Sequence, residues 1–282
     1  MDQEGAYIHV NGLRLHYVEQ GRGPAILLLH GFTGSTASWS RILPALAGGC
    51  RAVAVDLIGH GRSEAPRQWE RYTIAHCVTD LQALLDRLEI QQAVVLGYSM
   101  GGRVALSLAA AAPHRITALI LESTSPGLAT DEERAQRRRA DGDLAGMIED
   151  QGIETFVDHW EKLPLFASQQ DLPSAVRAGQ RAQRLANRPW GLANSLRGMG
   201  TGSMAPLHHQ LPALTMPALV IAGGLDAKYS STAQDMAAAM PRAELVIVPG
   251  AGHNVHLEQP DLFRCLVLSF LQSLRDKKLT HS

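Results

Sequence analysis

The chain has 282 residues, of which 45% are hydrophobic and 19% charged, and its formal net charge is −1. These totals fit an ordinary globular protein with one large domain, or a core with an insertion, and they give no general attraction to nucleic acid or to a membrane surface. Because the three cysteines are widely spaced, the first residues lack signal-peptide features and no apolar run could cross a bilayer, we expect a cytoplasmic protein without disulfides.

The first predicted element is a β-hairpin, because residues 7–10 and 13–18 flank the turn-forming pair Asn11-Gly12. Later apolar runs do not alternate with polar residues, which is typical of strands buried on both faces of a parallel sheet. These runs cover residues 25–29, 52–55, 93–96, 118–121, 218–221 and 245–248. Helical patterns lie between them, for example at 74–88, 103–112 and 262–274. The order predicts an α/β fold with a mostly parallel central sheet and an N-terminal antiparallel hairpin.

The strand predicted at 93–96 runs into Gly97-Tyr98-Ser99-Met100-Gly101, a G-x-S-x-G sequence that opens a helix. In this strand–turn–helix context the motif predicts a sharp turn that exposes the hydroxyl of Ser99 as a catalytic group. The alternative is a purely structural turn serine. The loop His30-Gly31-Phe32 follows an earlier strand, and the main-chain N–H groups of Phe32 and Met100 are therefore the expected oxyanion hole.

Residues 124–206 interrupt the alternation, since they contain helical patterns and many charges but no convincing strand. We expect them to form a helical lid inserted into a core made of residues 1–123 and 207–282. Two arginine groups lie in this lid: Arg134, Arg137 and Arg138, and the helix-spaced set Arg177, Arg181, Arg184 and Arg188. A solvated basic face explains most of them, but we expect one arginine from each group to enter a substrate pocket.

Asp226 and His253 follow the last two predicted strands, so the chain order Ser, Asp, His matches a serine catalytic triad. Asp56 also follows a strand, but it precedes the serine and is the less favoured acid. Arg103, in the first turn after Ser99, is a cation at the wrong end of a helix dipole, so an anionic ligand or an acidic partner should offset it. The histidines at 208, 209, 253 and 256 lack further ligands, and no metal site is predicted.

Several stretches together resemble the 2-succinyl-6-hydroxy-2,4-cyclohexadiene-1-carboxylate synthases of menaquinone biosynthesis, which have the α/β-hydrolase fold. The stretches are 97–103, 122–128, 133–139, Trp160 with Pro164-Leu165-Phe166, 196–202 and 251–258. The serine turn and the histidine loop are shared by many α/β-hydrolases, whereas Arg103 after the double glycine, Pro126-Gly127-Leu128 and the arginine-rich segment 133–139 are more specific. The resemblance covers nearly the whole chain.

This resemblance implies a lyase that eliminates pyruvate from 2-succinyl-5-enolpyruvyl-6-hydroxy-3-cyclohexene-1-carboxylate, with Ser99 as a base rather than a nucleophile. It implies that Arg103, Arg137 and Arg184 bind the three carboxylates of this small-molecule substrate, and that Tyr98 and Trp160 contact it or serve packing alone. No cofactor, nucleic-acid partner or membrane partner is implied. The alternatives are a serine hydrolase of esters or carbon–carbon bonds, and a non-catalytic ligand-binding module on the same fold.

Overall fold

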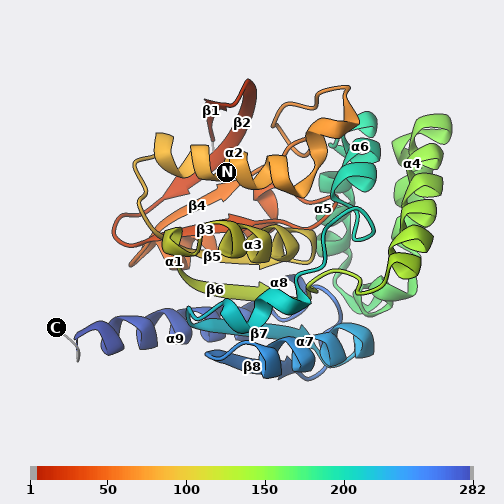
Figure 1. Cartoon of the computed structure of the whole chain (residues 1–282). Helices are drawn as coiled ribbons and strands as arrows, with labels where there is room; N and C mark the ends of the chain where they lie inside the picture. The colour runs from red at the N-terminus through yellow and green to blue at the C-terminus, as the bar shows by residue number, and fades with distance from the viewer. Residues whose placement is uncertain (1–4, 280–282) are drawn as a thin grey trace.

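The computed structural model describes residues 5–279, with side chains described as far as residue 276. One eight-stranded sheet forms its centre, in the order β1-β2-β4-β3-β5-β6-β7-β8 (Figure 1). The strands are β1 (Ala6–Val10), β2 (Leu13–Gln20), β3 (Ala25–Leu29), β4 (Arg51–Val55), β5 (Ala93–Tyr98), β6 (Ile116–Glu122), β7 (Ala218–Gly223) and β8 (Ala243–Val248). Strand β2 pairs antiparallel with β1 and β4, and all other pairings are parallel. The predicted fold class is confirmed.

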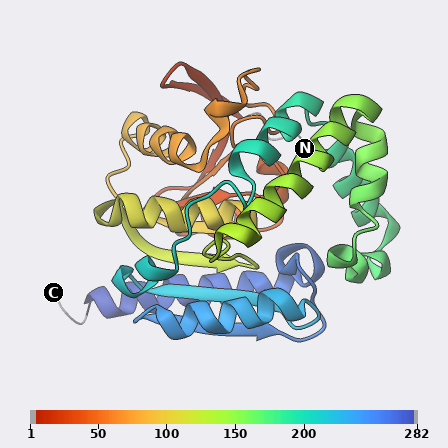
Figure 2. The ribbon, with the colours of Figure 1, turned by 45° about the vertical axis from the view of Figure 1, so that its right-hand side comes forward.

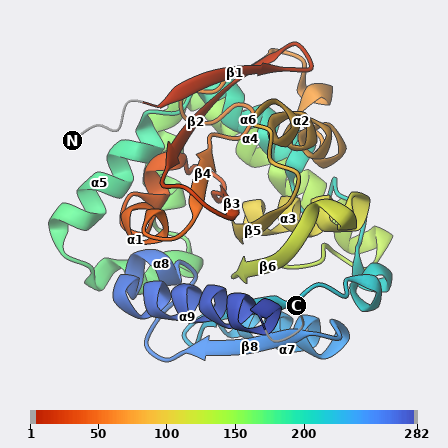
Figure 3. The same cartoon turned by 90° about the vertical axis from the view of Figure 1, so that its left-hand side faces the viewer.

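Helices cover both faces of the sheet, as Figure 3 shows from the side. One face packs against α2 (Ile74–Arg87), α3 (Met100–Ala111) and α7 (Ala227–Ala239). The other face packs against α1 (Leu43–Ala47) and α9 (Pro260–Leu279), with the short α8 (Val255–Glu258) beside them. Short 3₁₀ segments complete the core at Thr36–Trp39, Trp69–Tyr72, Pro113–Arg115 and His208–Ala213. No helix in the described part of the chain is both long enough and apolar enough to cross a membrane.

The last strand differs from the expectation that every apolar run is buried on both faces. Strand β8 lies at the edge of the sheet and pairs only with β7. Its residues Glu244 and Leu245 are exposed, and only Val248 is fully buried. The run at 245–248 forms the predicted strand, but the expectation of burial on both faces is wrong, because composition does not distinguish a central strand from an edge strand that has one covered face.

Between β6 and β7 the chain forms a helical insertion made of α4 (Asp131–Trp160), the 3₁₀ segment Pro164–Asp171, α5 (Ser174–Leu185) and α6 (Pro189–Met199). It lies beyond the carboxyl ends of the parallel strands (Figures 1 and 2). Helix α4 begins with a capping box between Thr130 and Glu133 and is kinked at Gly152, whose φ is 83°. The insertion has a small apolar core of its own, against which Phe32 of the β3 loop packs.

The insertion changes one expectation about its arginines. Helix α5 ends at Leu185, so Arg188 does not continue the stripe of Arg177, Arg181 and Arg184 but precedes α6 instead. Two of these four arginines, Arg181 and Arg184, are paired with carboxylates that lie outside the segment where they cluster. Arg181 bonds to Asp158 and Glu161, and Arg197 bonds to Glu149, all three acids belonging to α4 or its end. The basic charge is local in sequence but largely balanced in space.

Candidate active site

Ser99 lies at the tip of the turn that joins β5 to α3. Its backbone has φ 50° and ψ −107°, a conformation that non-glycine residues rarely adopt and that marks a functional constraint. The turn is possible because Gly101 has no side chain: a Cβ there would lie 2.1 Å from the carbonyl oxygen of Leu29. The main-chain N–H of Ser99 donates to the Glu122 carbonyl at 2.9 Å, and the Thr124 hydroxyl donates to the Ser99 carbonyl at 2.8 Å.

The structure brings the three predicted triad residues together. The Ser99 Oγ lies 3.0 Å from His253 Nε2, and His253 Nδ1 lies 2.7 Å from Asp226 Oδ2. Both partners of the serine are buried, with 2% of His253 and 8% of Asp226 exposed. The other Asp226 oxygen accepts the N–H of Tyr229 at 3.1 Å, so this carboxylate also caps α7. The arrangement has the geometry of an activated hydroxyl, a base and an orienting acid.

The rival acid Asp56 takes no part in the hydrogen bonds that join Ser99, His253 and Asp226. It is fully buried and pairs with His16 at 2.8 Å on the other side of β3. Burial acts to raise the pKa of Asp56, but the hydrogen bond from His16, the nearby His30 and the N–H groups of Arg62 and Thr36 together hold this pKa below its usual value. Asp56 is therefore an ionised structural carboxylate.

Both residues expected to supply the oxyanion donors line the same cavity as Ser99. Met100 is the first residue of α3, and Phe32 lies in the loop after β3. The loop approaches the serine closely at Gly31, where an added Cβ would come within 3.5 Å of the Ser99 Cβ and collide with the Tyr98 ring. Among the described residues, neither the Phe32 N–H nor the Met100 N–H donates to another group of the chain, which leaves both free for a ligand.

A cavity of about 250 Å³ opens beside the Ser99 hydroxyl, between the sheet edge and the helical insertion. Apolar side chains from both parts form most of its wall, including Phe32, Leu144, Trp160, Leu196 and Met199. Besides Phe32 and Met100, six of the predicted site residues line it: Tyr98, Ser99, Arg103, Arg137, Trp160 and His253. Such an apolar pocket with a few convergent polar groups is typical of a small-molecule site.

Arg103 reaches into this cavity from α3 and has no acidic partner within ion-pair distance among residues 5–276. Its Nη1 donates to the carbonyl oxygen of Met199 at 2.7 Å, which holds the side chain in place. Burial and the neighbouring Arg137, opposed by Tyr229 and Asp141, lower the pKa of Arg103 to about 10, and burial is the largest cause. The group stays a cation at neutral pH, and its charge is not neutralised by a salt bridge.

Arg137 lines the same cavity, and it is paired in a way that the sequence did not indicate. Its Nε donates to Asp141 Oδ1 at 2.8 Å, one helical turn further along α4. Neither Nη group bonds to another side chain in the described residues, so the outer face of the guanidinium remains available. Asp141 itself is 2% exposed, and its Oδ2 has no hydrogen-bond partner. Burial raises the pKa of Asp141 in spite of Arg137.

The structure places Arg184 outside the cavity that contains the serine. Only 5% of Arg184 is exposed, its Nη1 pairs with Glu161 at 3.0 Å and its guanidinium lies 5.2 Å from the centre of the Phe166 ring. It lines a neighbouring cavity of about 310 Å³, which shares Phe32, Tyr98 and Phe166 with the first. Arg184 is therefore separated from Ser99 by an aromatic wall.

Tyr98 and Trp160 are parts of that aromatic wall. The Tyr98 ring centre lies 5.5 Å from that of His253, and the Trp160 ring centre lies 5.3 Å from that of Phe32. Burial raises the pKa of Tyr98 well above its ordinary value, so its hydroxyl is neutral. The indole N–H of Trp160 is buried without a partner in the described residues, and the residue faces the cavity.

Sequence reasoning missed Asp141 and Tyr229. Tyr229 packs its ring 4.5 Å from His253 and lines the cavity. Its position three residues after the acid of the triad, at the start of a helix, was a usable signal. For Asp141, the spacing of four residues from Arg137 was visible, but an i, i+4 ion pair occurs on many surface helices. The histidines weighed as metal ligands form no cluster in residues 5–276, and His256 instead pairs with buried Glu122 at 2.7 Å.

Comparison with known proteins agrees with this geometry. The family model described as the alpha/beta hydrolase fold matches residues 24–260, so the chain belongs to that family. Within it, the chain belongs to the family of 2-succinyl-6-hydroxy-2,4-cyclohexadiene-1-carboxylate synthases. A relative from Bacillus subtilis (strain 168), provisionally named as this synthase, is 42% identical over 94% of this chain and 97% of its own length. The synthase of Salmonella paratyphi C is 31% identical over 87% of this chain and 92% of its own length.

Solved structures give the same result. MenH from S. aureus superimposes with a TM-score of 0.89 at 34% identity, covering 93% of this chain and 98% of the other. The enol-lactonase from Burkholderia xenovorans LB400 has a TM-score of 0.82 at 29% identity, covering 95% and 100%. The protein is thus an enzyme of a family that acts in menaquinone biosynthesis, and the resemblance inferred from its motifs is confirmed.

Proposed function

We propose that this enzyme eliminates pyruvate from 2-succinyl-5-enolpyruvyl-6-hydroxy-3-cyclohexene-1-carboxylate to give 2-succinyl-6-hydroxy-2,4-cyclohexadiene-1-carboxylate. The observation that carries the proposal is that the hydrogen-bonded residues Ser99, His253 and Asp226 lie beside a cavity. Arg103 and Arg137 line the same cavity. A neutral ester has no use for two arginines at the reacting centre, whereas a substrate with three carboxylates does. The names of the relatives support the same reaction.

In the proposed mechanism Ser99 acts as a base. Its Oγ removes the ring proton beside the succinyl ketone while its own proton passes to His253 Nε2, 3.0 Å away. Asp226, bonded to the other ring nitrogen, stabilises the imidazolium and fixes its orientation. The electron pair left on the ring carbon is delocalised as an enolate, whose oxygen accepts the N–H groups of Phe32 and Met100.

The enolate then collapses, the ring C–O bond breaks and the leaving group departs as pyruvate. The leaving enolate of pyruvate takes the proton that His253 holds, directly or through water, while the Ser99 hydroxyl keeps the ring proton, so the reaction is balanced without an oxidant or reductant. Arg103 and Arg137 hold substrate carboxylates, and the apolar wall around Trp160 keeps water away from the enolate. Arg184 would reach a carboxylate only from the neighbouring cavity, across Tyr98 and Phe166.

The test is to measure pyruvate release from the enolpyruvyl substrate, coupled to lactate dehydrogenase, with a p-nitrophenyl ester assayed in parallel. We expect rapid pyruvate release and weak ester cleavage. Ester cleavage without pyruvate release would overturn the proposed reaction and make the enzyme a serine hydrolase with an anion-binding pocket. Ligand binding without turnover of either compound would instead indicate a non-catalytic module.

A further inference from the structure

The loop that carries the Phe32 N–H is unusual in its backbone and in what holds it. Thr33, the next residue, has φ 66°, a left-handed conformation that a β-branched side chain strongly disfavours. A strained residue of this kind persists only where its surroundings fix it. The question is therefore which groups keep residues 31–36 in place beside Ser99.

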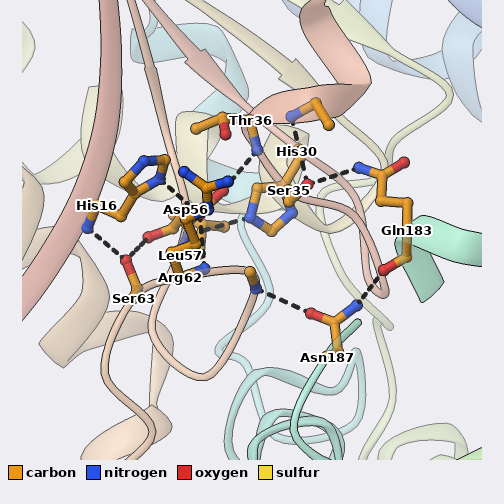
Figure 4. A network of polar contacts seen from close by, with 12 residues as sticks. His16, His30, Ser35, Thr36, Asp56, Leu57, Arg62, Ser63, Gln183 and Asn187 are labelled. Atoms are coloured by element: carbon orange, nitrogen blue, oxygen red, sulfur yellow. Dashed lines mark hydrogen bonds and ion pairs between the residues drawn. The ribbon is translucent and has the colours of Figure 1, made fainter. Parts of the chain in front are cut away.

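The core holds this loop at its two ends. The N–H of Thr36 donates to Asp56 Oδ1 at 2.5 Å, and the imidazole of His30 accepts the N–H of Leu57 at 3.0 Å (Figure 4). Asp56 also accepts the Arg62 N–H and pairs with His16, so it ties the loops after β3 and β4 to β2. These contacts leave the middle of the loop, at Thr33, without a core partner for its carbonyl oxygen.

That partner comes from the insertion. Asn187, in the connection between α5 and α6, donates from Nδ2 to the Thr33 carbonyl at 3.0 Å, while its Oδ1 accepts the Gly61 N–H at 2.9 Å. Figure 4 shows its amide pointing into the loops, with Gln183 of α5 directed at Ser35. The same Nδ2 also lies within hydrogen-bond distance of the Gln183 and Arg184 carbonyls, and only 4% of Asn187 is exposed. The amide is thus locked between the two parts of the molecule.

We propose that Asn187 is a positioning residue for the oxyanion hole: by bonding the Thr33 carbonyl it fixes the Thr33–Gly34 peptide, two peptides after the one that carries the Phe32 N–H, so that a docked insertion is needed for a competent donor. This inference rests on the assignment of the Phe32 N–H in the proposed function. It also explains why the residue is an asparagine, since bonding a carbonyl and an N–H at once requires both an amide donor and an amide acceptor.

Asn194 offers a matched control within the same insertion. It is also a buried asparagine, 5% exposed, and it joins α6 to the core by donating to the carbonyls of Pro66 and Arg67. Neither Asn194 nor its partners Pro66 and Arg67 line the cavity beside Ser99. Loss of either amide should lower thermal stability, but only loss of Asn187 should disturb the oxyanion hole.

The experiment compares Asn187→Ala, Asn187→Asp and Asn194→Ala by the rate at which a fluorophosphonate probe labels Ser99, alongside kcat and KM for pyruvate release. Asn187→Asp keeps the size and the bond from Gly61 but cannot donate to Thr33, so it serves if the alanine variant fails to fold. Because removal of one oxyanion donor costs roughly 100-fold or more, displacement of one should slow labelling and kcat at least tenfold, with KM changed less than threefold. Asn194→Ala should stay within twofold of the wild type.

Wild-type labelling by both Asn187 variants, or an equal loss in Asn194→Ala, would overturn the proposal. The labelling rate does not depend on the substrate, so it also separates this proposal from the proposed reaction. If the wild-type enzyme releases no pyruvate but the labelling pattern holds, the reaction is wrong and the role of Asn187 stands. If the wild-type enzyme releases pyruvate but the Asn187 variants are labelled at the wild-type rate, the proposed reaction stands and the proposed role of Asn187 is wrong.

Discussion

At the scale of single residues, the site combines one strained serine with charges that are only partly neutralised. Ser99 owes its position to a backbone turn. Asp226 lies in the loop after β7, and His253 lies in the loop after β8. Arg103 is bound to a carbonyl, and Arg137 shares its charge with a buried carboxylate. The free cationic surface of the cavity is therefore carried by these two arginines.

Replacing the serine tests its role directly. Ser99→Ala should lower kcat for pyruvate release by about a thousandfold or more, because the base is lost while the binding groups remain. The melting temperature should stay close to that of the wild type. Ser107→Ala, which removes a hydroxyl bonded to the Arg103 carbonyl on the same helix, is the control and should be nearly neutral. Retention of most activity by Ser99→Ala would remove the serine from the mechanism.

Replacing Arg103 tests whether its unpaired charge binds a substrate carboxylate. Arg103→Ala should raise KM or lower kcat by tenfold or more, as expected for a charge-assisted contact with a carboxylate. Arg138→Ala is a suitable comparison, since that side chain bonds to the Gly202 carbonyl and does not line the cavity. Kinetics that match the wild type in both variants would assign Arg103 to structure alone.

Asp141 gives a prediction about stability and pH. Its pKa is raised in the folded state, so the fold binds the proton more tightly than the unfolded chain, and stability falls as pH rises through the window above the ordinary carboxyl pKa. Asp141→Asn keeps an acceptor for Arg137 without the buried charge. We expect it to raise the melting temperature by about 2–3 °C at pH 7.5, equivalent to about 1 kcal/mol, and by less at pH 4. A loss of stability at both pH values would contradict this reading.

At the scale of elements, the helical insertion is held by pairs that cross from one helix to another. Arg184 and Arg181 of α5 both bond to Glu161 at the end of α4, and Arg197 of α6 bonds to Glu149 in the middle of α4. The apolar cluster around Phe156 and Trp160 lies between these helices and reaches the core through Phe32. The insertion and the oxyanion loop therefore share one packing unit.

Replacing Arg184 tests whether this side chain binds substrate or only stabilises the helical insertion. Arg184→Ala breaks a mostly buried ion pair, so the melting temperature should fall by several degrees, as expected for a cost of about 3 kcal/mol. Arg177→Ala, on the exposed face of the same helix, should change it little. If Arg184 acts only through packing, KM should rise less than threefold at a temperature where both proteins are folded. A tenfold rise in KM there would place a substrate carboxylate in the neighbouring cavity.

At the scale of the whole molecule, the loops after β3 and β4 form a polar layer beneath the insertion that contains buried neutral histidines. Burial lowers the pKa of His30, and it lowers the pKa of His60 to about 3, helped by His30. Because the unfolded chain titrates near 6.5, these groups contribute stability that is fully present above that pH. The contribution is lost as pH falls from 6.5 towards 3.

Acid unfolding should reveal this layer. The free energy of unfolding, measured by urea titration between pH 7.5 and 5, should fall with a slope of up to about 1.4 kcal/mol per pH unit for each histidine. His60→Gln should be less stable at pH 7.5 but should show a shallower slope below pH 6.5. His209→Gln, at an exposed site, should leave the slope unchanged. An unaltered slope in His60→Gln would show that His60 is not the group that titrates.

The sequence by itself determined the order of elements and identified the three residues of the triad. Continuous apolar runs indicated the parallel strands, and the G-x-S-x-G sequence between a strand and a helix indicated a sharp turn, so Ser99, Asp226 and His253 were recognisable from local context and chain order. Arg103 stood out as a cation at the positive end of a helix dipole, whereas Arg137 was selected from its arginine group only through the family resemblance.

Only the tertiary structure decided which charges are free and which segments support one another. Arg184 pairs with an acid 23 residues away, and Asn187 bonds to a residue 154 positions earlier, separations at which composition and periodicity carry no information. Whether β8 is central or at an edge likewise depends on what the rest of the chain covers. The physical reason is that pairing and burial are properties of neighbours in space, and a sequence specifies those neighbours only through the completed fold.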